Sequence, residues 1–330
     1  MSNRHGHFQG PSDTINGLNP NLLQGIPSPV RIVEVGPRDG LQNEARIVPT
    51  GVKARFIAKL VESGLKTIEV TSFVNPRWIP ALADATELAH DLPPHPGVRY
   101  AALVPNVQGY ERFHETSLDM AAVFMSASES HNKKNINKSI EETFPVLEAV
   151  IARARADGKA VRGYVSTVFG CPYEGDVLPA SVLRVVKRML EWQVDEISLG
   201  DTIGVANPAQ VVRVVAALAD AGVPLDKIAL HFHDTRGTAL ANYLAGLQLG
   251  VTMFDTSVGG LGGCPYAPGA AGNAATEDLV YMLHGMGVET GIDLVKLAEA
   301  GRMIAGALGK TLPGKYHQAY VAACDAPKPH

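Results

Sequence analysis

The sequence predicts an α/β fold, namely a closed (β/α)8 barrel with extra C-terminal helices. Short β-branched runs alternate with amphipathic helical segments at a spacing of roughly 30 residues, as βαβ crossovers require. Eight such units can be counted, which favours a closed barrel over an open sheet. No G-x-G-x-x-G motif follows the first strand segment, and this argues against the alternative, a doubly wound sheet that binds a dinucleotide.

The individual elements follow from hydrophobic periodicity. The first strand segment, VRIVEV, precedes a loop and then a helix that Thr50 is expected to cap and Gly64 to end. A second helix is expected near Ile79 to Asp91, and helices from residue 288 onward are expected to cover the barrel mouth or an interface. The expected strands are 30–35, 66–74, 98–105, 119–128, 160–169, 195–202, 227–234 and 253–258. The clearest further helices span 139–158, 179–193 and 208–222.

Composition limits the classes of function. The 330 residues have a formal net charge of -4 and a pI near 6.3, which leaves no basic footprint for nucleic acid or a membrane surface. No window approaches the roughly 18 apolar residues of a membrane span. Three cysteines do not make a disulfide framework, and the opening residues lack the apolar region of a secretory signal. We therefore expect a cytoplasmic protein.

The expected domain organisation is simple. Residues 29–312 form the TIM barrel with its C-terminal helical cap, 1–28 form a flexible N-terminal tail, and 313–330 form a C-terminal tail. In barrels of this type the C-terminal ends of the strands carry the chemistry. Polar residues gather at these expected strand ends: Arg38, Asp39, Glu69, Ser126, Ser128, Tyr164, Ser166, Asp201, His231 and His233.

The histidines of the segment IALHFHD lie on one face of the seventh strand. Strand alternation places Ile228, Leu230 and Phe232 toward the outer helices, so that His231 and His233 point into the barrel. Two imidazoles about 6.5–7 Å apart along one strand can converge on a single metal ion. The alternative is a pair of buried histidines with ordinary hydrogen-bond partners, but the Arg-Asp-Gly sequence after the first strand favours a metal site.

The type of metal depends on the remaining ligands. Two imidazoles and one carboxylate are compatible with non-haem iron, whereas added amide and substrate oxygens favour six-coordinate Mg²⁺ or Mn²⁺. A structural zinc site would require cysteines or a fourth protein ligand to complete the coordination of the ion, and no such ligand is adjacent in the sequence.

A glycine-rich stretch, SVGGLGGCPYAPGAAGNAATEDLV, follows the eighth strand. Its small residues permit close approach of the backbone to a ligand and hinge motion. Cys264 lies within it and is a candidate proton carrier, although most free cysteines are simply small buried residues. Asn273 precedes a helical segment, so helix capping is the simple explanation for this asparagine.

Five segments together resemble the 3-hydroxy-3-methylglutaryl-CoA lyases: VEVGPRDGLQNE, EVTSFVNPRWIPALAD, SASESHNKKNINKSIEE, HFHDTRGTALAN and GLGGCPYAPGAAGNAATEDLVYML. The resemblance runs from about Val30 to Ile304. It implies Mg²⁺- or Mn²⁺-dependent cleavage of an acyl-CoA substrate to acetoacetate and acetyl-CoA, in a homodimer. The metal ligands it implies are Asp39, His231, His233 and Asn273.

The resemblance also implies roles for other residues. Arg38 would stabilise the developing enolate and Glu69 would hold Arg38 in place, while His231, Cys264 and Asp39 would move protons in an order that the sequence leaves open. Substrate contacts or supporting roles fall to Gln42, Ser72, Tyr164, Asp201 and Glu277. Cations for the CoA phosphates are Lys133, Lys134 and Lys138, which could equally be an ordinary solvated loop.

Several other functions share parts of this pattern. A lyase for a longer 3-hydroxy-3-alkylglutaryl-CoA, an acyl-CoA condensing enzyme and a 4-hydroxy-2-oxoacid aldolase would use the same metal site. A condensing enzyme usually carries a further C-terminal domain, and an aldolase needs no CoA contacts. A non-haem iron oxygenase belongs to a different class and would consume oxygen. A non-enzymatic scaffold would not require so many polar strand ends.

Overall fold

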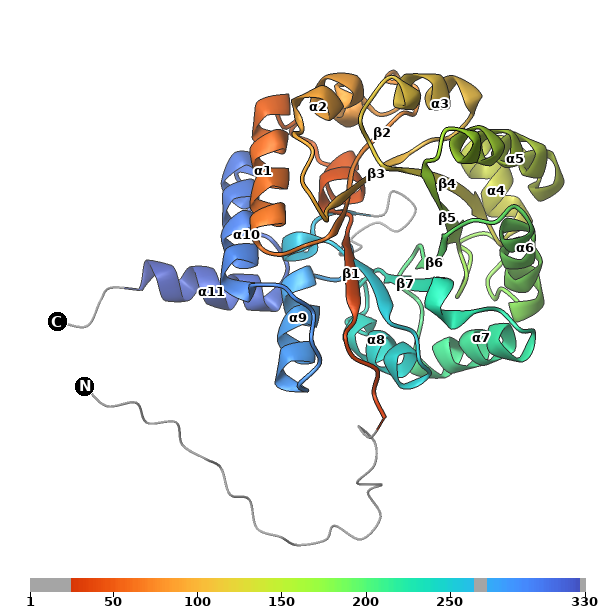
Figure 1. The fold of residues 1–330 in the computed structure, drawn as a ribbon. Coiled ribbons are helices and arrows are strands. Elements are labelled where there is room, and N and C mark those ends of the chain that lie inside the picture. Colours follow the sequence, from red (N-terminus) through yellow and green to blue (C-terminus); the bar gives the residue numbers. More distant parts are fainter. Residues whose placement is uncertain (1–24, 264–271, 327–330) are drawn as a thin grey trace, which may run out of the picture.

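The computed structural model describes residues 25–263 and 272–326, and Figure 1 shows their fold as a ring of helices around a barrel. Its eight parallel strands close in sequence order, each pairing with the next and β8 pairing with β1. The strands are β1 Arg31–Glu34, β2 Thr67–Ser72, β3 Arg99–Leu103, β4 Met120–Ser126, β5 Ala160–Ser166, β6 Glu196–Asp201, β7 Ile228–Phe232 and β8 Met253–Thr256. The predicted (β/α)8 barrel is therefore confirmed.

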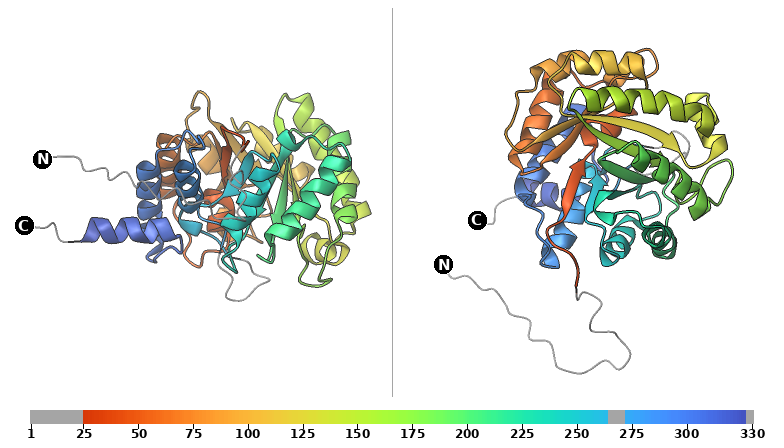
Figure 2. Two further views of the ribbon diagram at one scale, coloured as in Figure 1. Left: turned by 90° about the horizontal axis from the view of Figure 1, so that it is seen from below. Right: turned by 45° about the vertical axis from the view of Figure 1, so that its right-hand side comes forward.

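Helices cover the outside of the barrel (Figures 1 and 2). The α-helices are α1 Thr50–Glu62, α2 Ala85–Asp91, α3 Val107–His114, α4 Glu129–Ile136, α5 Ile140–Ala156, α6 Pro179–Glu191, α7 Pro208–Asp220, α8 Ala239–Gln248, α9 Thr276–Gly285, α10 Leu294–Leu308 and α11 Lys315–Asp325. Short turns of other helical types are η1 Gly36–Gly40, η2 Pro80–Leu82, η3 Leu225–Lys227 and η4 Val258–Gly260. None of the helices in the described part of the chain is long and apolar enough to span a membrane.

Strand alternation separates two apolar layers. In β7, Ile228, Leu230 and Phe232 belong to the large core between the strands and the outer helices. Ala229 instead joins a small cluster with residues of β1 and β8 inside the barrel. This arrangement agrees with the predicted orientation of β7, which turns the face bearing His231 inward.

Two local predictions differ from the structure. The N-cap of α1 is Pro49, and Thr50 is the first helical residue, whose hydroxyl donates to Asp84 Oδ2 at 2.9 Å. A tertiary acceptor therefore takes the hydroxyl that was expected to cap the helix. The single helix expected from Ile79 to Asp91 is divided into η2 and α2, with Asp84 between them.

The C-terminal tail predicted from residue 313 is wrong, because α11 forms there. The backbone N–H groups of Lys315 and Tyr316 donate to the Asp278 carboxylate at 2.9 and 2.6 Å, and His317 is buried. These contacts anchor α11 beside α9 and α10 (Figure 1). Of these helices α10 packs against α1, and α9, α10 and α11 all contact η4, the turn that follows β8.

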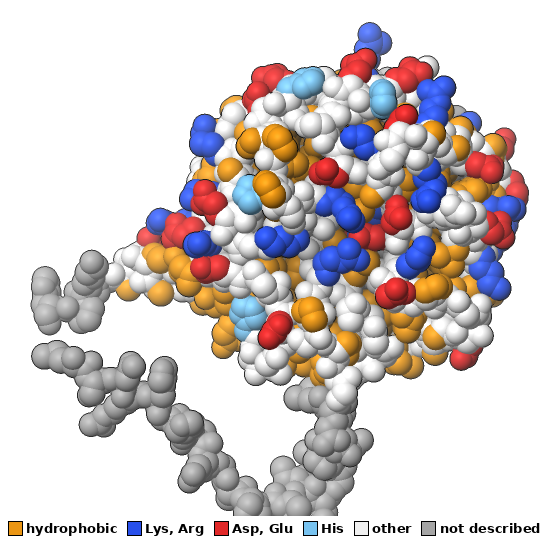
Figure 3. Space-filling model, viewed as in Figure 1, with side chains coloured by type: hydrophobic (Ala, Val, Ile, Leu, Met, Phe, Trp, Pro, Cys, Tyr) orange, Lys and Arg blue, Asp and Glu red, His pale blue; other side chains and the backbone are white. Residues whose placement is uncertain are grey.

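The surface carries mixed charge. On the face seen in Figure 3, Lys and Arg side chains are interspersed with Asp and Glu.

Glu34, at the end of β1, ties that strand to the segment after β8. Its Oε1 accepts from the N–H groups of Gly36 and Val258 at 2.8 and 2.9 Å, and its Oε2 accepts from Thr276 Oγ1 at 2.6 Å. Complete burial raises the pKa of this carboxyl to about 8, even though these hydrogen bonds favour the ionised form.

The free energy of unfolding of a Glu34→Gln variant is expected to fall less with rising pH than that of the wild type. Folding raises the pKa of Glu34 from 4.5 to about 8, so its contribution to the free energy of unfolding falls across that range. The loss is at most a few kcal/mol, because one pKa unit corresponds to about 1.4 kcal/mol. A glutamine can still accept from the N–H groups of Gly36 and Val258 through its amide oxygen, and its amide nitrogen can donate to Thr276 Oγ1. Urea unfolding at several pH values measures the free energy of unfolding of each protein. The same pH dependence in the wild type and the variant would contradict this prediction.

Candidate metal and catalytic site

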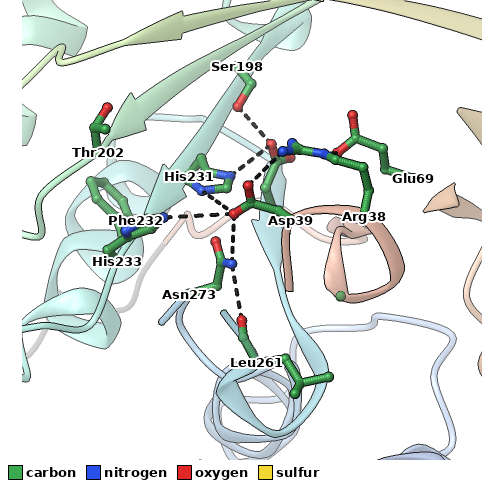
Figure 4. A network of polar contacts seen from close by, with 12 residues as sticks. Arg38, Asp39, Glu69, Ser198, Thr202, His231, Phe232, His233, Leu261 and Asn273 are labelled. Carbon is green, nitrogen blue, oxygen red and sulfur yellow. Dashed lines mark hydrogen bonds and ion pairs between the residues drawn. The ribbon is translucent and has the colours of Figure 1, made fainter. Parts of the chain in front are cut away.

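The predicted metal ligands come together at the C-terminal end of the barrel. Asp39 lies in η1 after β1, His231 lies in β7, and His233 follows β7. Asp39 Oδ2 is 4.0 Å from His231 Nε2 and 3.9 Å from His233 Nε2. In Figure 4 the dashed lines from His231, His233 and Asn273 meet at one carboxylate oxygen of Asp39, Oδ2.

A turn of π-helix presents Asp39. The Val35 carbonyl accepts from the N–H groups of Arg38, Asp39 and Gly40 at 3.2, 2.8 and 3.2 Å. Turns of π-helix are rare in proteins, and those that occur often lie at functional sites. Gly40 permits the turn to pack closely, because a Cβ there would lie 2.8 Å from Leu261 Cβ. The sequence Arg-Asp-Gly is thus folded into a tight element directly over the end of β1.

The donor atoms fit a divalent cation. One ligand atom from each of Asp39, His231 and His233 lies within 4.8 Å of the others. Ligands about 2.1 Å from one ion are at most about 4.2 Å apart, so small side-chain rotations suffice to close the set around it. Asn273 Oδ1 is buried without a hydrogen-bond partner among the described residues, which suits a further oxygen ligand.

The capping interpretation of Asn273 is wrong. The N-cap of α9 is Ala275, and its side chain forms no capping hydrogen bond. Asn273 Nδ2 instead donates to Asp39 Oδ2 at 2.9 Å and to the Leu261 carbonyl at 3.1 Å. An isolated β-bridge also pairs the backbones of Asn273 and His233. Tertiary contacts therefore direct the Asn273 side chain toward the predicted metal ligands.

Arg38 is held by two carboxylates beside the ligands. Its Nε donates to Glu69 Oε2 at 2.7 Å, and its Nη1 donates to Asp39 Oδ1 at 2.6 Å. Pairing of β2 with β3 shifts register between Glu69 and Thr71, and such bulges re-aim side chains. The Arg38 guanidinium lies 5.7 Å from the centre of the Tyr164 ring, which is buried. The structure thus brings Glu69 and Tyr164 together with Arg38.

The protonation states of Asp39 and His233 suit a cation. Burial would raise the pKa of Asp39, but Arg38 and the two imidazoles outweigh it and hold that pKa well below its usual range. Burial and the neighbouring His231 lower the pKa of His233 to about 4. The carboxylate is therefore ionised and His233 is neutral at pH 7, as metal ligands must be.

Asp201 and Glu277 hold backbone near the mouth. Asp201 accepts from the N–H groups of Val205 and Ala206 at 2.9 and 3.0 Å, and burial raises its pKa to about 6. Glu277 accepts from the Gly259 N–H at 2.6 Å and lies 3.7 Å from His317 Nδ1. Both carboxyls fix loops after strands, which is a supporting role.

The remaining predicted residues are more scattered. Ser72 is buried and its Oγ accepts from the Val74 N–H at 3.3 Å, while Gln42 is half-buried after η1. Lys133 lies 3.6 Å from Glu129. Exposed lysines on or just after α4 are Lys133, Lys134 and Lys138. Cys264 lies outside the described residues.

Sequence reasoning missed a buried charged group inside the barrel. Arg162 donates to Asp255 and to Glu196, and all three side chains are buried. Its guanidinium lies 5.3 Å from the Tyr164 ring, on which Arg38 also packs. Strand alternation could have found this group, because Arg162 and Tyr164 share the inward face of β5.

Comparison with known proteins places these residues in a wider context. A family model described as HMGL-like matches residues 29–304. The hydroxymethylglutaryl-CoA lyase of Bacillus subtilis is 54% identical over 294 residues, covering 89% of this chain and 98% of that protein. The cytoplasmic 3-hydroxy-3-methylglutaryl-CoA lyase of Rattus norvegicus is 52% identical over 297 residues, covering 90% of this chain and 86% of that protein.

Solved structures agree with the sequence relatives. The crystal structure of the Bacillus subtilis HMG-CoA lyase matches with a TM-score of 0.88 and 53% identity, over 90% of this chain and 99% of that one. An HMG-CoA lyase from Acinetobacter baumannii, in complex with coenzyme A and 3-methylmalate, matches with a TM-score of 0.85 and 37% identity. That match covers 91% of this chain and 98% of the other.

Proposed function

The chain belongs to the HMGL-like family, and we propose that its barrel mouth cleaves 3-hydroxy-3-methylglutaryl-CoA to acetoacetate and acetyl-CoA with a divalent metal ion. It is a carbon–carbon lyase that acts on an acyl-CoA, as its relatives' names indicate. The observation that carries the proposal is the convergence of Asp39, His231 and His233 beside Arg38.

Four side chains would hold the metal: Asp39, His231, His233 and Asn273. Their mixture of imidazole and oxygen donors, open to substrate oxygens, supports Mg²⁺ or Mn²⁺. When bound, such an ion polarises the C3 hydroxyl of the substrate and lowers the pKa of that hydroxyl. Asn273 Nδ2 also anchors Asp39 Oδ2, which keeps the carboxylate turned toward the imidazoles.

The cleavage itself sets two tasks for the side chains. The C3 hydroxyl loses its proton, the bond between C2 and C3 breaks, and its electron pair stays on the thioester fragment as an enolate. Glu69 and Asp39 hold two nitrogens of Arg38, namely Nε and Nη1. We assign Nη2 to the developing enolate oxygen, where a preorganised cation stabilises the transition state.

Proton transfers complete the reaction. A base accepts the hydroxyl proton, and an acid delivers a proton to the enolate carbon to give acetyl-CoA. Asp39 and His231 are the candidates for the first proton. Cys264 and His231 are the candidates for the second.

Metal removal tests this function. We expect protein stripped with EDTA to release no acetyl-CoA or acetoacetate from 3-hydroxy-3-methylglutaryl-CoA, and Mg²⁺ or Mn²⁺ to restore both products in equal amounts. Both products are quantified by coupled assays. Full activity in EDTA would contradict the metal-dependent mechanism. Metal binding without products would instead point to a substrate with a longer 3-alkyl group or to an aldolase.

A further inference from the structure

We propose that Asp255 positions the imidazole of His231, so that its Nε2 faces the metal ligand Asp39, and that Arg162 holds Asp255 in place. Asp255 acts through His231, and Arg162 acts through Asp255. The inference rests on the proposed function, because the imidazole is positioned for the metal ion of that site.

The two ring nitrogens of His231 face different carboxylates. Nε2 lies 4.0 Å from Asp39 Oδ2, and Nδ1 lies 3.5 Å from Asp255 Oδ2. His231 and Asp255 are register partners on the adjacent strands β7 and β8. At 3.5 Å the contact is longer than an ordinary hydrogen bond, and Nδ1 is buried with no closer partner among the described residues. Asp255 is therefore the acceptor available to a proton on Nδ1.

Asp255 is itself fixed from two sides. Its Oδ2, which faces His231, accepts from Ser198 Oγ at 2.7 Å, and its Oδ1 accepts from Arg162 Nη2. The side chain of Asp255 is fully buried. A buried carboxylate that lacked this guanidinium would be an uncompensated charge. The pair with Arg162 therefore keeps Asp255 an ionised acceptor directed at the histidine.

The support for Asp255 extends to the opposite end of the barrel. Arg162 also donates to Glu196, whose other oxygen lies 2.7 Å from Arg31 Nη1 and 3.6 Å from Arg99 Nη1. The guanidinium of Arg162 is thus fixed by carboxylates on both sides. This arrangement leaves the Asp255 carboxylate little freedom to rotate.

Metal-binding histidines commonly donate their second N–H to a carboxylate, which sets the tautomer and the ring orientation. A proton on Nδ1 leaves the lone pair of Nε2 free for the metal. The arrangement of Asp255, His231 and Asp39 has this form. If Asp255 served only to neutralise Arg162, the tautomer and metal affinity of His231 would not depend on it.

The experiment compares the wild type with Asp255→Asn and with a matched control, Glu34→Gln. Each change converts a fully buried carboxylate into an amide, but Glu34 faces no metal ligand. Mn²⁺ affinity is measured by electron paramagnetic resonance. The His231 tautomer is read from ¹⁵N spectra of Mg²⁺-loaded and metal-free full-length protein, above the titration range of histidine.

We expect the wild type to carry the proton on Nδ1 of His231. Asp255→Asn is expected to weaken Mn²⁺ binding by about 10–100-fold and to change the tautomer, because the amide can donate to Nδ1. Glu34→Gln is expected to change neither. A wild-type proton on Nε2, or an unchanged Mn²⁺ affinity in Asp255→Asn, would overturn the inference.

Two outcomes separate this inference from the proposed function. If the wild type binds no Mn²⁺, the metal site itself is refuted. If the wild type binds Mn²⁺ and Asp255→Asn binds it equally well, only the role of Asp255 is refuted. If Asp255→Asn does not fold, the wild-type spectrum still decides which nitrogen carries the proton. Ser198→Ala is then the second variant, expected to weaken Mn²⁺ binding by a few-fold because it frees Asp255 Oδ2.

Discussion

An Arg38→Met variant is expected to lose about 10²–10³ in kcat, as enzymes do when one preorganised donor is removed from a transition state. Methionine replaces only the unbranched stem of the side chain and provides no charge for the enolate oxygen. The metal ligands remain, so Mn²⁺ binding is expected to persist. Steady-state rates of acetyl-CoA release and a Mn²⁺ titration of the same sample measure the two effects separately.

The control for Arg38→Met is Arg184→Met, which changes an exposed arginine on α6 that pairs with Glu141. This control is expected to keep the wild-type rate. Arg38→Lys is expected to stay strongly impaired, because a lysine cannot reproduce the two-sided contacts to Glu69 and Asp39. A kcat within threefold of wild type in Arg38→Met would exclude Arg38 from the chemical step.

In a His233→Ala variant, Mn²⁺ affinity and activity are both expected to fall by at least about 100-fold. This loss is larger than the one expected when a residue that only hydrogen-bonds to a metal ligand is removed. His233 Nε2 lies 3.9 Å from Asp39 Oδ2, and burial keeps the imidazole neutral, so its lone pair is ready for a cation. Electron paramagnetic resonance of Mn²⁺ and the lyase assay measure the two losses.

Excess Mn²⁺ helps to interpret His233→Ala. If the variant is impaired mainly in binding the ion, high Mn²⁺ is expected to restore part of the rate. His284→Ala is the matched control, since His284 is an exposed histidine of α9 that contacts Thr290. Wild-type Mn²⁺ affinity in His233→Ala would remove this residue from the ligand set and weaken the interpretation of the paired histidines.

Much of the fold was predictable because it depends on local patterns. Helices and strands have different hydrophobic periods, and each unit of this chain repeats the alternation of the two. The end of each parallel strand reaches the same face of a barrel, so residues after different strands could be assigned to one site. His231, His233 and Asp39 were found in this way, and the structure brings them within reach of one ion.

Predictions failed where a local signal competed with a distant partner. Thr50 and Asn273 both precede helical segments, and both were interpreted as caps. In the structure Thr50 donates to Asp84, and Asn273 donates to Asp39. Asn273 and Asp39 are 234 residues apart in sequence, and no local pattern reports that contact. The helix at Lys315–Asp325 was missed for a similar reason, since Asp278 supplies its N-terminal acceptors.

The sequence by itself determined the barrel, its order of strands and the face on which the chemistry lies, because periodicity and strand polarity are properties of short segments. Only the tertiary structure decided how the site is supported. The contacts of Arg162 with Asp255 and Glu196 join three strands across the barrel interior. Buried charges require partners, and which partners meet depends on closure of the whole barrel.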